Sequence, residues 1–438
     1  MATLTDNIIS LAKRRGFVFP SSEIYGGIGG FWDYGPLGVE LSNNIKAAWW
    51  KAMVHDRDDI VGLDSSIIMN PKVWQASGHV TSFTDPLVEC KACHQRFRAD
   101  QPDEITAHET KHHSEGIKDV SWTEPRQFNL LFRTFVGPVE DSSSQAYLRG
   151  ETCQGIYVNF PNVVNSMRVR VPFGIAQIGK AFRNEVTPGK FLFRCREFEQ
   201  MELEYFVHPK EADTWFAYWK EERMKWHLSL GLAKEHLRFR QHEPTERAHY
   251  AADSWDIEYN YPEWGFKELE GVANRTDYDL KTHGKWSGMD LSYSDPITQE
   301  KYIPYIIEPS VSPQRLFIAL LIDAYKEEEK RVVLQLHPKL APVKVAVFPL
   351  VANKDNIVGK AKEVYTVLKK KFVTAWDDRG NIGKRYLSQD EIGTPWCVTI
   401  DYDTLESDTV TIRDRDTTKQ ERVNVSKLVE YFSAKLEA

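Results

Sequence analysis

The sequence predicts an α+β fold in two units, a long β-rich unit with flanking helices and a smaller α/β unit near the C-terminal end. Two observations lead to this prediction. Two strand-like runs over residues 178–207 are joined by a turn at Pro188 and Gly189, residue types that favour turns. Beyond residue 343, buried-strand runs alternate with helical periodicity, which is typical of a small α/β domain.

Apolar spacing predicts the elements of the first unit. After Pro36, a residue type that suits the first helical position, an apolar side chain recurs every four residues to Trp49, which indicates a helix over residues 36–55. The same reasoning predicts helices over residues 211–230 and 313–325. Short apolar runs predict strands at residues 60–71, 157–160, 169–171, 178–186, 191–207, 257–259 and 266–270.

A linker at residues 336–342 carries two prolines, Pro338 and Pro342, and separates the two units. We therefore expect domains over residues 1–340 and 343–438. In the second domain, strands are expected at residues 344–350, 396–402 and 408–414, and helices at residues 357–371 and 425–435.

Composition limits the class of protein. The 438 residues are 42% hydrophobic and 27% charged, which is ordinary for a globular protein. Lys and Arg number 56 against 63 Asp and Glu, so the net charge of −7 argues against a uniformly basic nucleic-acid-binding surface but leaves room for a local basic groove. Five cysteines indicate a reducing compartment, and no apolar run is long enough for a membrane span. We expect a soluble cytoplasmic enzyme.

The second strand of the hairpin concentrates chemistry on one face. Because alternate residues of a strand share a face, we expect five side chains of this strand, at alternate positions from 194 to 202, on the same face. On the preceding strand, Arg183 and Glu185 share a face in the same way. The hairpin would thus display three arginines, two carboxylates and an aromatic ring together, with the second strand contributing Arg194, Arg196, Phe198, Gln200 and Glu202.

A solvated, salt-bridged sheet face would explain these charges, but it gives the lone Phe198 no role. A flat site for an aromatic base and its phosphates explains both, with arginine on phosphate, the ring stacked on the base and a glutamate on an exocyclic amine. A second anion site is indicated where Ser312 and Pro313 begin a helix with Arg315 in its first turn. A capped helix with an arginine facing solvent explains that segment equally well.

Residues 181–185, Ala-Phe-Arg-Asn-Glu, continued by 193–198, Phe-Arg-Cys-Arg-Glu-Phe, resemble motif 2 of class II aminoacyl-tRNA synthetases. Within that class, the sequence resembles the homodimeric glycyl-tRNA synthetases. Six further blocks lie along the chain in the order that the family has, at residues 30–38, 63–67, 76–80, 151–155, 268–271 and 308–310.

The resemblance implies an antiparallel catalytic sheet flanked by helices and a C-terminal α/β anticodon-binding domain, in which residues 378–385 fit the family pattern. It also implies an aminoacyl-tRNA ligase that makes glycyl-adenylate from glycine and ATP and charges tRNA-Gly, releasing AMP and pyrophosphate. Its expected parts are motif 1 at about residues 36–71, forming the homodimer contact, an insertion at about 86–128, motif 2 at about 178–207, a helical insertion at about 209–250 and motif 3 at about 308–325.

By matching position, the resemblance assigns catalytic roles to Arg183, on the α-phosphate of ATP, and to Arg315, which covers the base and reaches the γ-phosphate. Glu185 would accept a hydrogen bond from the adenine amine, Phe198 would stack on the base and Glu268 would bind Mg²⁺. The full expected ATP site is Arg183, Asn184, Glu185, Phe193, Arg194, Cys195, Arg196, Glu197, Phe198, Glu268, Leu269, Ser312, Pro313, Gln314 and Arg315.

The resemblance also implies a glycine site in which three carboxylates surround one ammonium and a filled pocket excludes any side chain. The expected residues are Arg98, Glu151, Phe198, Glu199, Gln200, Met201, Glu202, Glu308, Pro309, Ser310, Val311 and Ser312. Two departures from the family pattern stand out: the segment 312–314 is Ser-Pro-Gln where small and acidic residues are usual, and Gly150 stands where the family generally has proline.

The insertion carries Cys90 and Cys93, followed by His108 and His112, at a spacing found in zinc sites. An ordinary insertion with solvated histidines explains the pattern too, and the sequence alone assigns no metal ligand. Two other functions remain as alternatives: another class IIa ligase, and a catalytically silent paralogue that resembles the accessory subunit of mitochondrial DNA polymerase. The retained site residues argue against the silent paralogue.

Overall fold

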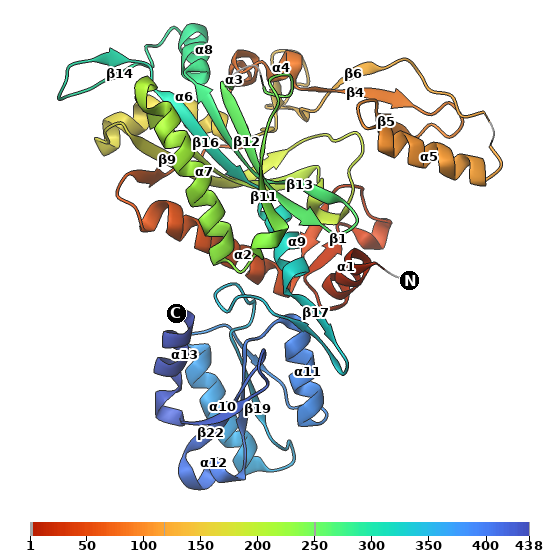
Figure 1. The fold of residues 1–438 in the computed structure, drawn as a ribbon, viewed down its shortest axis with the longest axis vertical. Coiled ribbons are helices and arrows are strands. Elements are labelled where there is room, and N and C mark those ends of the chain that lie inside the picture. The colour runs from red at the N-terminus through yellow and green to blue at the C-terminus, as the bar shows by residue number, and fades with distance from the viewer. Residues whose placement is uncertain (1–2, 118, 249–250, 438) are drawn as a thin grey trace.

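The computed structural model describes residues 3–117, 119–248 and 251–437, with a large N-terminal unit and a smaller C-terminal unit below it in Figure 1. Within these residues, no helix is both long and apolar enough to cross a membrane.

A seven-stranded sheet organises the large unit. Every neighbouring pair is antiparallel except β3 and β9, which run parallel. The strands, in spatial order, are β11 (Leu237–Gln241), β12 (Asp253–Tyr261), β13 (Gly265–Thr276), β16 (Tyr305–Val311), β10 (Glu197–Val207), β9 (Phe173–Phe182) and β3 (Ile60–Gly62).

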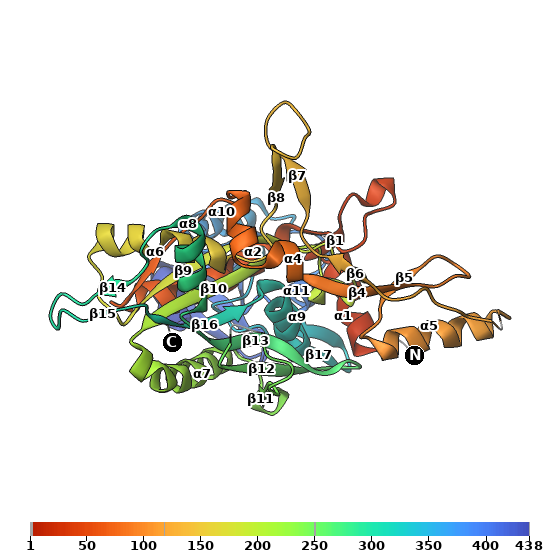
Figure 2. The same cartoon turned by 90° about the horizontal axis from the view of Figure 1, so that it is seen from above.

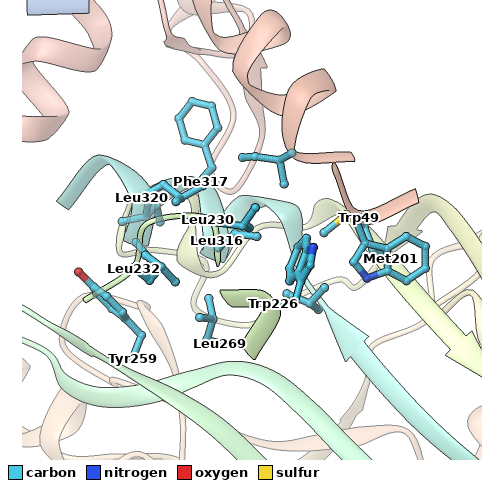
Figure 3. Close-up of a cluster of buried hydrophobic side chains, with 14 of the residues drawn as sticks. Trp49, Met201, Trp226, Leu230, Leu232, Tyr259, Leu269, Leu316, Phe317 and Leu320 are labelled. Atoms are coloured by element: carbon cyan, nitrogen blue, oxygen red, sulfur yellow. The ribbon is translucent and has the colours of Figure 1, made fainter. Parts of the chain in front are cut away.

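The alternation of side chains along β10 separates the two faces of this sheet. Met201, Leu203 and Tyr205 are buried in the main hydrophobic core, part of which is drawn in Figure 3. We call this side the core face; it is covered by α2 (Pro36–Trp50), α7 (Ala212–Ser229) and α9 (Pro313–Ala324).

The opposite face carries Gln200, Glu202 and Glu204, and we call it the site face. Towards one end of it, Phe206 joins a second apolar cluster built with α6 (Cys153–Met167) and α8 (Tyr278–Ser287). Figure 2 shows α6 and α8 on one side of the sheet and α7 on the other. Polar residues on the site face are therefore held between two packed layers.

A smaller three-stranded sheet projects from the large unit, at the right of Figure 1. It comprises β5 (Arg96–Arg98), β4 (Thr84–Glu89) and β6 (Arg126–Asn129), accompanied by α5 (Pro102–Ser114). The remaining elements of the large unit are α1 (Leu4–Arg14), β1 (Val18–Pro20), β2 (Trp32–Tyr34), α3 (Pro71–Ala76), α4 (His79–Ser82), β7 (Arg133–Phe135), β8 (Gln145–Tyr147), β14 (Tyr293–Ser294), β15 (Lys301–Tyr302), β17 (Tyr325–Glu328) and β18 (Arg331–Leu334).

The C-terminal unit has its own core, which includes Val347, Ile400 and Phe432. In its sheet, the three strands β20, β19 and β21 run parallel, and β22 and β23 add antiparallel edges. The strands are β20 (Thr374–Trp376), β19 (Val345–Pro349), β21 (Trp396–Ile400), β22 (Thr409–Asp414) and β23 (Gln420–Asn424), and the helices are α10 (Asp355–Lys369), α11 (Ile382–Ile392), α12 (Tyr402–Ser407) and α13 (Leu428–Glu437).

Several expected elements differ from the structure. Residues 157–160, expected as a strand, lie inside α6, because a short apolar run does not distinguish a buried helix from a strand. The expected strand at 60–71 ends at Gly62, and Pro71 begins α3 instead of ending a strand. Residues 169–171 form no strand, and β9 begins at Phe173, earlier than expected.

The segment expected as a helical insertion at residues 209–250 contains α7, but also β11, which pairs with β12 as the edge strand of the main sheet. Residues 249–250 lie outside the described part of the chain. Helix α11 was not predicted as a helix from the sequence.

Candidate functional site

An arginine-lined cleft opens on the site face where β9 and β10 meet. Arg183 directly follows β9, and Phe198 lies opposite Ala181 on β10. The Arg183 guanidinium carbon is 5.2 Å from the ring centroid of Phe198 and 5.2 Å from that of Phe83. The cleft is lined by Arg183, Glu185, Leu192, Phe193, Arg194, Cys195, Phe198, Gln200, Glu268, Ser310, Ser312 and Arg315.

Arg315 closes the other side of this cleft from the first turn of α9. Its guanidinium carbon is 4.6 Å from the Phe193 ring centroid, and its Nη1 is 2.9 Å from Oε1 of Glu268 on β13. The positive charge of Arg315 lowers the pKa of Glu268. Two guanidinium groups on either side of an aromatic slot suit a planar base with attached phosphates.

Glu185 supplies an unused acceptor to the cleft. Its side chain is 9% exposed, and its Oε2 atom has no hydrogen-bond partner among the described residues. A buried acceptor without a partner is costly, and a ligand amine would satisfy it. This geometry fits the expected contact with the adenine amine.

A second, acidic pocket of about 280 Å³ adjoins the cleft. Glu202 of β10 accepts hydrogen bonds from Ser310 Oγ (2.9 Å), Gln200 Nε2 (3.2 Å) and the Thr152 hydroxyl. The pocket is lined by Glu151, Arg183, Gln200, Glu202, His242, Glu246, Ala248, Ala251, Ser254, Asp256, Glu268, Gly271, Val272, Ala273, Glu308 and Ser310.

Few cations balance these carboxylates. Arg275 Nη1 lies 2.5 Å from Glu308 Oε2, but the same guanidinium also binds Asp279 through Nε at 2.8 Å. Tyr157 donates hydrogen bonds to Glu204 (2.7 Å) and Glu308 (3.4 Å). A small cation would therefore be favoured in this pocket.

The pKa values of the three glutamates in this pocket are shifted by burial and by the charges around them. Burial, together with repulsion from Glu202 and Glu151, raises the pKa of Glu308 to about 8, although Arg275 opposes the shift. Burial and the charge of Glu151 also raise the pKa of Glu202. Burial alone would raise the pKa of Glu151, but the nearby His79, whose Nε2 is 3.3 Å from Oε1, and Arg275 hold it well below its usual range.

The cleft and the acidic pocket share a wall. Four residues line both of them: Arg183, Gln200, Glu268 and Ser310. Because Arg183 faces both spaces, a group bound in the acidic pocket can meet a phosphate bound in the cleft at this arginine. This shared boundary is what a reaction between two substrates requires.

The structure brings most expected residues to the site but turns others away. Glu199, expected on glycine, lies on the core side of β10, where Lys46 Nζ is 3.0 Å from its Oε1. Glu197 pairs with Lys180 on the same side. Strand alternation also places Met201, Pro309 and Val311 away from the pocket. Leu269 is turned into the core by a bulge in β13, where Ile257 pairs with Glu270 but Glu258 pairs with Glu268.

Two further expected arginines make contacts with the protein in this structure. Arg196 precedes β10, so strand alternation does not apply to it, and its guanidinium donates to the main-chain oxygens of Glu185 and Gly29. Arg98, expected on glycine, pairs with Asp85 at 2.8 Å and with Asp100 at 2.7 Å. Neither arginine lines the cleft or the pocket.

The Ser-Pro-Gln departure in motif 3 has a structural explanation. Ser312 is the N-cap residue and Pro313 begins α9 as expected, but the serine hydroxyl makes no capping hydrogen bond. Instead, Gln314 Oε1 accepts a hydrogen bond from the main-chain N–H of Glu199 at 3.1 Å. The glutamine therefore ties α9 to β10 beneath the cleft.

Sequence reasoning missed five residues that shape the acidic pocket. Their contacts come from segments far apart in the chain; Arg275 lies in β13 and Asp279 in α8, so their spacing of four residues gives no helical signal. His79 and Thr152 stood in the sequence only as members of the blocks at residues 76–80 and 151–155. The missed residues are His79, Thr152, Tyr157, Glu204 and Arg275.

Comparison with known proteins defines the class first. The solved prolyl-tRNA synthetase from Cryptosporidium parvum, complexed with halofuginone and AMPPNP, aligns with 99% of this chain and 75% of its own, with a TM-score of 0.68 at 16% identity. Residues 344–435 match the family model of an anticodon binding domain. The fold is that of a class II aminoacyl-tRNA synthetase.

Closer relatives specify the family. The chain is 52% identical to glycine–tRNA ligase of Thermobifida fusca and 54% identical to that of Caldanaerobacter subterraneus, covering 98% of each chain in both alignments. Identity to glycine–tRNA ligase of Borreliella burgdorferi is 52%, over 98% of this chain and 97% of the relative. The protein belongs to the glycine–tRNA ligase family.

Proposed function

We propose that this protein joins glycine to tRNA-Gly in two steps. In the first, glycine and ATP give glycyl-adenylate and pyrophosphate; in the second, the glycyl group passes to the 3′ end of the tRNA and AMP is released. The wall that the arginine-lined cleft shares with the acidic pocket supports this proposal, because it would bring an amino acid next to a nucleotide phosphate.

In the activation step, a glycine carboxylate oxygen attacks the α-phosphorus of ATP, and the bond to the pyrophosphate oxygen breaks. Negative charge grows on the α-phosphate oxygens in the transition state. Arg183 lies between the two spaces and would stabilise that charge, while Phe198, 5.2 Å from the guanidinium, would hold the base side of the nucleotide.

The acidic pocket would bind the glycine ammonium. Glu151, Glu202 and Glu308 offer carboxylate oxygens, and Arg275 and Thr152 fix two of them in place. Glycine has only its two charged groups for recognition, so this set would supply the affinity. We propose that exclusion of larger amino acids is steric, as the family resemblance implies.

Glu268 and Asp256 suit Mg²⁺ bound with ATP. Both line the acidic pocket, and Glu268 also lines the cleft. Burial and the charge of Glu268 raise the pKa of Asp256 to about 6, although His242 Nε2 lies 2.8 Å from its Oδ2. Close carboxylate oxygens are the ligands that Mg²⁺ prefers, and the ion would offset phosphate charge.

The C-terminal unit would bind tRNA. The side chain of Arg379 is 88% exposed and Lys384 is also exposed, so both can reach a phosphate. Arg385 has a different role: it is buried and donates to the main-chain oxygens of Pro349 and Gly380.

A homodimer is proposed through the motif 1 region. Val39 of α2, and Ile67 and Ile68 later in the expected motif 1, remain exposed in the single chain. Exposed apolar side chains are candidates for burial in an interface. We propose the cytoplasm as the site of action.

Exchange of pyrophosphate into ATP tests the activity on the purified protein. We expect exchange that requires glycine and is not supported by alanine, and charging of tRNA-Gly under the same conditions. A protein that folds, binds tRNA and shows no glycine-dependent exchange would instead be the silent paralogue.

A further inference from the structure

The projecting insertion gathers two cysteines and two histidines at one point. Cys90 and Cys93 lie at the turn between β4 and β5, and His108 and His112 lie one turn apart on α5. The ligand atoms of all four side chains lie within 4.8 Å of one another. The pattern seen in the sequence is therefore also a cluster in space.

These histidines are buried, contrary to the alternative that they are solvated. The exposed fraction is 7% for His108 and 6% for His112. In the described structure, both ring nitrogens of His112 lack a hydrogen-bond partner. A buried polar group without a partner is costly, so the site provides an unused ligand atom aimed into the cluster.

We propose that Cys90, Cys93, His108 and His112 bind one structural Zn²⁺. Thiolate and imidazole ligands suit zinc and disfavour Mg²⁺ and Ca²⁺, which take oxygen ligands. Four protein ligands complete a tetrahedral site and leave no open position for a substrate. The site is separate from the ATP cleft and from the acidic pocket.

The surroundings support a closed site. Phe97 and Trp122 lie beside His108, with centroid distances of 4.6 and 5.6 Å, and they shield the cluster from water. Glu115 Oε2 lies 3.5 Å from His112 Nδ1. A carboxylate beside one ring nitrogen can orient a histidine whose other nitrogen binds metal.

The ion would join α5 to the β4–β5 turn, since two ligands come from each. Helix α5 carries Glu104, whose Oε1 is 3.8 Å from Arg194 Nη1, and Arg194 lines the ATP cleft. Zinc would therefore hold the insertion in the position from which it contacts the cleft. Loss of the ion should loosen residues 84–129 and leave the main sheet intact.

Metal content of the full-length protein tests this site directly. After expression with zinc and extensive dialysis, mass spectrometry of the metals should find about one zinc per chain. Protein stripped of metal and titrated with Co²⁺ should show the visible absorption of a tetrahedral cobalt–thiolate site. Hydrogen exchange should then be faster in residues 84–129 of the stripped protein than in the loaded protein.

Matched variants locate the ligands. Cys93→Ser and His112→Gln should lose zinc and the cobalt spectrum, whereas His113→Gln and His94→Gln should keep both, because His113 and His94 are exposed neighbours. Zinc-free wild-type protein with no cobalt spectrum would overturn the proposal. So would equal zinc in His112→Gln and His113→Gln. If a ligand variant fails to fold, the wild-type cobalt titration decides alone.

Discussion

Replacing Glu308 by glutamine should change how glycine affinity depends on pH. With a pKa of about 8, this carboxyl is mostly protonated at pH 7 in the empty site. An ammonium favours the ionised form, so glycine must displace the proton. Because the pKa is raised, glycine binding should strengthen as pH rises towards 8 and weaken below it.

The size of the effect follows from the ionised fraction. Protonation should weaken apparent glycine binding by about 11-fold at pH 7 and by about 100-fold at pH 6, relative to the fully ionised site. Glutamine has no proton to release, and it loses a charge-assisted hydrogen bond of about 1.5–3 kcal/mol. Glu308→Gln and the parent should therefore have equal affinities at a pH between about 6 and 7, and the parent should bind glycine about 10- to 120-fold more tightly at pH 8.5.

Calorimetric titration with glycine from pH 6 to 8.5 measures this dependence. Repeating it at pH 7 in buffers of different ionisation enthalpy counts the protons released, and we expect net proton release from the parent and a smaller release from Glu308→Gln. Glu199→Gln is the matched control, since Glu199 faces Lys46 on the core side of β10. It should retain the parental pH dependence.

Three results would refute this reasoning. The parent protein could show the same glycine affinity at pH 6 and pH 8. Glu308→Gln could keep the parental slope. Glu199→Gln could abolish the slope as fully as Glu308→Gln does. Each of these outcomes would mean that Glu308 is not the group whose proton glycine displaces.

Three further changes probe the reaction, tRNA binding and folding. Arg183→Ala should raise the activation free energy of exchange by about 2.7–4 kcal/mol, which is about 100- to 1000-fold in kcat/KM, with an unchanged melting temperature, and a loss under threefold would contradict its role. The double variant Arg379→Ala, Lys384→Ala should impair tRNA charging but not exchange, and equal loss of both activities would refute a tRNA contact. Asp390→Ala leaves buried Arg413 unpaired, so denaturant unfolding should show a loss of about 3–5 kcal/mol in stability; a loss below about 1 kcal/mol would contradict this.

Local sequence determined much of the candidate cleft. The alternation of residues along a strand correctly placed Phe198, Gln200 and Glu202 on one face of β10. Pro313 correctly marked the start of α9, which brings Arg315 to the cleft. These features follow from the backbone geometry of one element and its immediate neighbours, and so they can be predicted without knowledge of the rest of the fold.

Alternation was reliable only where the strand was regular. Arg196 precedes β10 and points elsewhere, and the same period that places Glu202 in the pocket turns Glu199 towards α2. A list of contiguous site residues therefore includes side chains on both faces of the sheet. The register of β10 decides which of them can meet a ligand.

Tertiary structure alone decided the electrostatics of the acidic pocket. Arg275, Glu151 and Glu308 come from different elements, and their charges meet only when β10, β13 and β16 pair beneath α6. The same is true of His112, which is buried because α5 packs on the β4–β5 turn. Burial and the distance between charges set a pKa or a ligand geometry, and both arise from contacts between segments that are remote in the sequence.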